Sequence, residues 1–182
     1  MRLASFRYEE IKKVIANLLE ELEIRTLPIN ELEIAKKLNI PLVPYSAVGV
    51  EPESFDLLTK CSADGFISTG SVTKIYYNDV DNSYQRMKWT IIHEIGHSIL
   101  GHKESSEVAE TEADFFVGYL LAPPVLIHEF KIKTPAEIVD RFGLSLTAAS
   151  YALNRYKKWL KYGNDCYTEY EMRIYSIFSL VA

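Results

Sequence analysis

The sequence predicts a mainly helical α+β domain that carries one small β-sheet. Two patterns predict this class: long segments in which apolar residues recur every three to four positions, and two short runs in the middle of the chain that are rich in β-branched and aromatic residues. The third observation is size. A chain of 182 residues with 48% hydrophobic residues can build one compact core, so we expect a single domain over residues 1–182.

The helices follow from apolar spacing and from residues that begin or end helices. Apolar positions at helical spacing predict a first helix over 5–24, and Asn30 is placed to cap a second helix over 31–38. Residues 42–45 are expected to be extended. The remaining helices are expected at 52–59, 82–100, 107–121, 135–141 and 146–161, with a helical or irregular tail from Tyr167.

Residues 65–69 and 72–78 are predicted to be two strands of an antiparallel hairpin that turns at Gly70-Ser71. This small antiparallel sheet directly precedes the helix over 82–100 in the sequence. Residues 74–78 could align a peptide substrate by accepting it as an extra strand, or they could be a covered strand of the core. The sequence leaves both alternatives open.

Charge and composition disfavour several classes of function. The net charge of −5 and the pI of about 5.4 disfavour non-specific binding of nucleic acid. They also leave no polybasic patch that could bind a membrane surface. Residues 1–13 are charged rather than an apolar signal core, and no apolar run reaches the roughly 18 residues of a membrane span. Cys61 and Cys166 are expected to be reduced thiols, which is typical of a cytoplasmic protein.

The segment His93-Glu94-Ile95-Gly96-His97 is an H-E-x-x-H motif inside a predicted helix. Residues four apart lie on one face of a helix, so the two imidazoles can hold one Zn²⁺. Glu94 stands beside them and can act as a general base toward water. Burying two histidines and a glutamate without partners would be costly, and a metal removes that cost. The pattern therefore predicts a catalytic zinc site with His93 and His97 as ligands.

The third zinc ligand is expected on the next helix, over 107–121. Glu110 and Asp114 lie four residues apart and share one face. Glu110 can therefore bind the metal while Asp114 orients a ligating histidine through its other ring nitrogen. Glu112 points about 200° away from Glu110 and is the less favoured metal ligand. The alternative for Glu112 is a solvated charge on the helix surface.

The chain contains two further histidines, His102 and His128. The metzincin pattern H-E-x-x-H-x-x-G-x-x-H requires glycine and histidine where this chain has Leu100 and Lys103. His102 would point away from the histidine pair on a continuous helix, so we expect it to be a loop or helix-end residue rather than a ligand. His128 is a candidate oxyanion donor, although the sequence supplies no geometry for it.

Together these residues resemble a known family. Residues 89–97 (WTIIHEIGH) look like the "FTLAHELGH" core of the ImmA/IrrE-type zinc metallopeptidases, and residues 110–123 look like their "ExEANxFAxxLLMP" segment. The resemblance is strongest over 65–123, which we take as the zincin-like metallopeptidase core. It implies a zinc-dependent peptidase with Glu94 as catalytic base and Glu110 as ligand. Family members often carry Asn at the position of Asp114.

The resemblance also implies a partner: a helix-turn-helix repressor of a mobile element, phage or stress response, cleaved at a specific site. A rival class rests on residues 134–162, which resemble a helix-turn-helix themselves. In that alternative the chain is a DNA- or partner-binding regulatory module, including a toxin–antitoxin component, with a non-catalytic metal site. The intact Glu94 argues against this alternative, because a structural zinc needs no general base.

Overall fold

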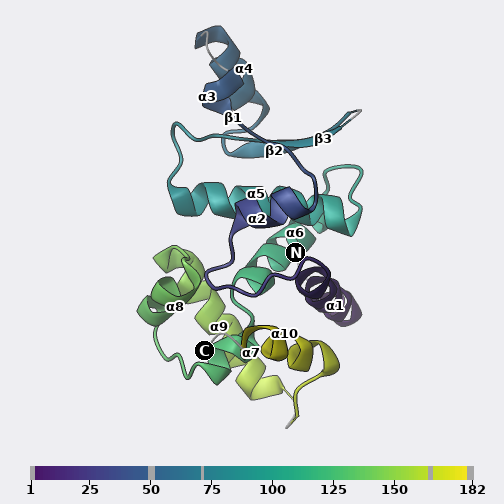
Figure 1. Cartoon of the computed structure of the whole chain (residues 1–182), viewed down its shortest axis with the longest axis vertical. Helices are drawn as coiled ribbons and strands as arrows, with labels where there is room; N and C mark the ends of the chain where they lie inside the picture. Colours follow the sequence, from purple (N-terminus) through teal and green to yellow (C-terminus); the bar gives the residue numbers. More distant parts are fainter. Residues whose placement is uncertain (1–2, 49–51, 71, 164–165, 180–182) are drawn as a thin grey trace.

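The computed structural model describes residues 3–48, 52–70, 72–163 and 166–179. Within these ranges the protein is mainly helical with one small sheet, as predicted (Figure 1). None of the helices in these ranges is long and apolar enough to cross a membrane. Cys61 and Cys166 are free thiols on the surface. The helices are α1 Ser5–Glu21, α2 Glu31–Lys37, α3 Tyr45–Val48, α4 Pro52–Cys61, α5 Tyr84–Leu100, α6 Glu107–Leu121, α7 Pro124–Glu129, α8 Pro135–Phe142, α9 Leu146–Tyr162 and α10 Glu169–Ser179.

The sheet has three strands in the order β1-β3-β2, namely β1 Leu42–Pro44, β2 Gly65–Thr69 and β3 Thr73–Tyr77. β2 and β3 form the expected antiparallel hairpin, with Ile67 opposite Ile75; Ser71 of the predicted turn lies outside the described residues. The structure adds β1, which pairs with β3 in parallel. The sheet is therefore mixed rather than purely antiparallel.

The strand order decides between the two alternatives for residues 74–78. β3, which contains most of this segment, lies between two strands and has no edge left to accept a peptide. The structure therefore supports the alternative of a covered strand and not that of a substrate-aligning edge. β2 is an outer strand of the sheet and also contacts α5, so it is the edge that borders the H-E-x-x-H helix.

α5 lies between the sheet and a group of helices made up of α1 and α6 to α10 (Figure 1). Its first turn is capped by Ser83, whose hydroxyl accepts a hydrogen bond from the Arg86 amide. Its buried face carries Ile91, Ile92 and Ile95, which join the hydrophobic core. α6 packs against α5, and the two helices together support the polar cluster of the next section.

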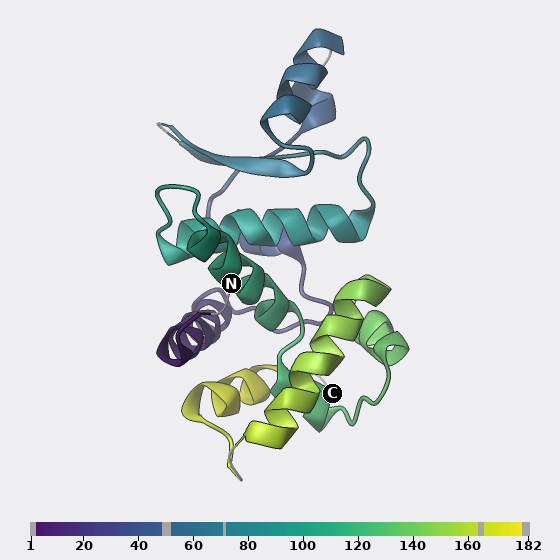
Figure 2. The same ribbon diagram turned by 180° about the vertical axis from the view of Figure 1, so that it is seen from behind.

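α1 and the helices α7 to α10 form a second group below α5 and α6 (Figure 2). α1 packs on α6 and α10, while α7 packs on α9 and α10. α6 ends at Leu121, just before the proline pair Pro123-Pro124, and Pro124 also begins α7, a helix that was not predicted. Proline favours the first turn of a helix because the amide it lacks would have no partner there. The tail from Tyr167 contains the helix α10.

Candidate metal centre

The H-E-x-x-H helix and α6 bring together three of the predicted ligands. His93 Nε2 lies 3.0 Å from His97 Nε2 and 3.2 Å from Glu110 Oε2, while His97 Nε2 lies 3.6 Å from Glu110 Oε1. The ligand atoms of these residues form a group that could hold a metal ion. His93 and His97 are mostly covered, whereas Glu110 is half-exposed and leaves the cluster open toward solvent.

Gly96 allows α6 to approach α5 so closely. A Cβ atom at this position would lie 3.0 Å from the Phe116 ring, tighter than ordinary van der Waals contact. The glycine inside the motif therefore removes the side chain that would push the two helices apart. As a result, a carboxylate on α6 comes within reach of imidazoles on α5.

These residues fit a zinc ion. Zinc binds imidazole nitrogen and carboxylate oxygen at about 2.0–2.1 Å in a tetrahedron, which places neighbouring ligand atoms about 3.3 Å apart. The three separations in the cluster, 3.0, 3.2 and 3.6 Å, bracket that value. Two neutral imidazoles and one carboxylate also match the donor set of catalytic zinc. The fourth position of such a tetrahedron would be left for water.

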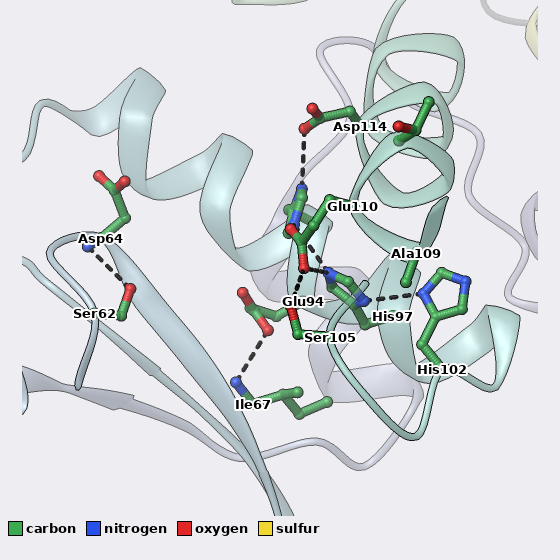
Figure 3. Close-up of polar contacts among 12 residues, drawn as sticks. Ser62, Asp64, Ile67, Glu94, His97, His102, Ser105, Ala109, Glu110 and Asp114 are labelled. Carbon is green, nitrogen blue, oxygen red and sulfur yellow. Dashed lines mark hydrogen bonds and ion pairs between the residues drawn. The ribbon is translucent and has the colours of Figure 1, made fainter. Parts of the chain in front are cut away.

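Asp114 lies where the sequence analysis placed it. Its Oδ1 is 3.2 Å from His93 Nδ1, the ring nitrogen that faces away from the cluster (Figure 3). A carboxylate at this nitrogen favours the tautomer with the proton on Nδ1, so that Nε2 keeps its lone pair for a metal. Asp114 is itself exposed to solvent.

His102 makes the corresponding contact to the second histidine, which the sequence analysis did not foresee. Its Nδ1 lies 2.9 Å from His97 Nδ1 (Figure 3). The expectation that His102 points away assumed a continuous helix, but α5 ends at Leu100 and Gly101 has a φ of 73°. This left-handed cap turns the chain back so that the His102 ring meets His97. Glycine just after the motif helix was the signal for this turn.

Glu112 lies outside the group formed by His93, His97 and Glu110, and it is not a solvated charge. Only 6% of the residue is exposed, and its Oε2 lies 3.0 Å from His102 Nε2. The Arg7 guanidinium of α1 donates to both of its oxygens, at 2.8 and 2.5 Å. The hydrogen bond from Arg7 lowers the pKa of Glu112 and keeps it ionised. The prediction of a surface charge is wrong because α1 packs over this face of α6.

The contacts of His102 are consistent with one set of proton positions. An ionised Glu112 can only accept, so His102 Nε2 donates to it and His102 Nδ1 is left as an acceptor. His97 Nδ1 then donates to His102, and His97 Nε2 keeps a lone pair directed at the cluster. The series of hydrogen bonds from Arg7 through Glu112 and His102 therefore favours the tautomer of His97 that can bind a metal.

Glu94 lies beside the cluster, between α5 and β2. Its Oε2 accepts a hydrogen bond of 3.0 Å from the Ile67 amide (Figure 3). Burial raises the pKa of Glu94 to about 7, against the opposing effects of nearby His93 and the Ile67 amide. A carboxylate with this pKa can both take up and release a proton near neutral pH.

His128 lies away from this cluster. It stands in the last turn of α7, where its Nδ1 shares a 3.0 Å hydrogen bond with the Tyr156 hydroxyl and its ring packs near Trp159. The expectation that His128 could donate to an oxyanion at the metal site is therefore wrong. The proline break carries the chain to α7, on the side of α6 remote from the sheet (Figure 1).

A comparison with protein-family models gives one match. The model described as the IrrE N-terminal-like domain, Peptidase M78, covers residues 61–154. This stretch includes β2, β3, α5 and α6 and extends through α8 into α9. A search of curated proteins found no match.

Proposed function

This chain belongs to the Peptidase M78 family, and on that premise we propose that it is a zinc-dependent metallopeptidase whose metal is held by His93, His97 and Glu110. The observation that carries the proposal is the spacing of the three ligand atoms, 3.0 to 3.6 Å, beside the half-buried carboxylate of Glu94. When bound, zinc would supply a Lewis acid that activates water and polarises the scissile carbonyl group.

Glu94 is the general base of the proposed reaction. Its carboxylate takes a proton from the attacking water and then delivers that proton to the nitrogen of the leaving amine. The Ile67 amide holds the carboxylate at the edge of β2. Asp114 and His102 keep the two imidazoles oriented through their Nδ1 atoms.

The outer edge of β2 is the proposed place for the substrate backbone. β2 pairs with β3 on one side, and no other described strand pairs with its opposite side, where the Ile67 amide meets Glu94. A peptide laid along this edge would gain backbone hydrogen bonds and bring its scissile bond next to Glu94. We propose a helix-turn-helix repressor as the substrate, which the family resemblance supports.

The test is cleavage of repressor proteins encoded beside this gene by the zinc-loaded protein. Glu94→Gln keeps the shape of the side chain but removes the base, so it should lower the cleavage rate by about 10²–10⁴-fold. It should retain zinc. Glu21→Gln, on the exposed end of α1, is the matched control and should cleave at the normal rate. Full activity of Glu94→Gln would rule out the assigned base.

A further inference from the structure

A second site lies in the lower group of helices, where α7 and the loop after it face α9. Here a cavity of about 390 Å³ opens to the surface. Its apolar wall is formed by Ile132, Leu153 and Leu160, of which Leu160 is 53% exposed. Three lysines, Lys131, Lys133 and Lys157, also line it. We refer to these six residues as the basic groove.

The basic groove is electrostatically unlike the rest of the chain. Residues 128–163 contain seven lysines and arginines against three acidic residues, although the whole chain carries a net charge of −5. The other residues together therefore carry −9. Lys131, Lys133 and Lys157 are exposed, and none of their ammonium groups forms an ion pair with another residue in the part of the chain that the structure describes. Positive charge is thus concentrated beside a cavity wall in which Ile132 and Leu153 are buried and Leu160 is exposed.

His128 and Tyr156 also line this cavity and contact each other. His128 and Tyr156 share a hydrogen bond, and the Tyr156 ring stacks on Trp159 at a centroid distance of 5.9 Å. The groove lies toward the C-terminal half of α9, the end remote from α5 (Figure 2). It is therefore a separate site and not an extension of the metal cluster.

Nucleic acid fits this groove less well than a peptide does. In the helix-turn-helix alternative, α9 would present its basic residues to DNA, but Arg155 is half-buried and its guanidinium donates to the Gly118 carbonyl of α6. Nucleic-acid binding rests on neutralising a row of phosphates, whereas here three lysines surround an apolar cavity. A peptide that carries apolar side chains flanked by carboxylates matches both the apolar wall and the three lysines of the groove.

We infer that the basic groove binds an acidic segment of a partner protein. Apolar side chains of that segment occupy the space beside Ile132, Leu153 and Leu160. Its aspartate or glutamate side chains pair with the lysines at the rim. Electrostatic attraction of this kind speeds association and weakens as salt is added.

The test uses the full chain as Glu94→Gln, so that a peptide cannot be cleaved and the outcome is independent of the proposed peptidase activity. The probe is a fluorescein-labelled twelve-residue peptide of glutamate and leucine, and its twin carries lysine in place of glutamate. Fluorescence anisotropy should show binding of the acidic peptide, at least tenfold tighter than the lysine twin and weaker at high salt.

Two sets of substitutions locate the binding. Changing Lys131, Lys133 and Lys157 to glutamate should weaken binding of the acidic peptide at least tenfold. The same change at the exposed Lys13, Lys36 and Lys60 is the matched control and should weaken binding much less. Leu160→Ser keeps every charge and should weaken binding several-fold even at high salt, because it removes part of the apolar wall.

Four results would overturn the inference. The lysine twin could bind as tightly as the acidic peptide, or the control triple variant could lose as much affinity as the groove variant. A twelve-base-pair duplex could bind more tightly than the peptide, which would make the partner a nucleic acid. Light scattering could show that the chain alone self-associates and that the groove variant does not, which would make the occupant a second copy.

Discussion

The two faces of α6 use the same kind of side chain in opposite ways. On one face, Glu110 and Asp114 are exposed in part and approach the two histidines of α5. On the other face, Glu112 is buried and held by Arg7 and His102. Glu110 and Glu112 are two residues apart, so helix geometry alone sends them to different surroundings.

The comparison shows that a carboxylate's role depends on what packs over it. Among the residues that the structure describes, no lysine or arginine pairs with Glu110, and its side chain stays open to solvent, which suits a group that must bind a metal. Glu112 is tied to α1 through Arg7, which lies 105 residues away in the sequence. Glu112 also contacts His102, and His102 in turn contacts His97 Nδ1. The ion pair of Arg7 and Glu112 is therefore linked by hydrogen bonds to the predicted metal ligand His97.

The largest expected effect separates the two glutamates by zinc content. Glu110→Ala should lose nearly all zinc after dialysis, because two imidazoles alone bind the metal weakly. Glu112→Ala should retain about one zinc per chain. Elemental mass spectrometry of the purified variants measures this. A folded Glu112→Ala protein without zinc, beside a zinc-loaded Glu110→Ala protein, would reverse the assignment.

Removing the groups behind the histidines should have the next largest effect. Asp114→Ala and His102→Ala should each weaken zinc affinity by about 10–100-fold, because the ring that each one orients becomes free to rotate or change tautomer. Competition with a fluorescent chelator measures the affinity. Asp114→Asn should lose less zinc affinity than Asp114→Ala, because the amide oxygen still accepts a hydrogen bond from His93 Nδ1. Equal losses for both Asp114 variants would contradict an orienting role.

The ion pair on the other face should matter for stability. Glu112→Gln should lower the free energy of unfolding by about 1–3 kcal/mol, since a hydrogen bond to a charged partner is lost at a buried position. Urea denaturation of the metal-free protein measures this. Glu10→Gln removes the exposed partner of Arg7 and is the matched control, with an expected change below about 1 kcal/mol. A larger loss for Glu10→Gln would contradict the contrast.

The smallest expected effect is the pH dependence of that stability. The pKa of Glu112 is lowered in the folded protein, so its contribution is present above the unfolded pKa of about 4.3 and is lost as the pH falls through the folded value. The stability difference between wild type and Glu112→Gln should therefore shrink as the pH is lowered below about 4. Urea titrations at neutral and acidic pH measure it. A difference that grows in acid would contradict the sign.

The sequence by itself determined those features of the protein that are set within a single helix. The spacing of His93 and His97, and of Glu110 and Asp114, puts each pair on a single face, and the structure has both pairs facing each other. Apolar spacing likewise located the long helices to within a few residues. These features were accessible because helix geometry fixes the direction of neighbouring side chains without reference to the rest of the chain.

Tertiary structure decided what covers those faces. β1 joined the sheet in parallel and made β3 its central strand, and a left-handed glycine turned His102 back onto His97. Arg7 reached Glu112 only because α1 packs against α6. Contacts such as these join segments far apart in the chain and depend on how whole elements pack, which no local spacing encodes.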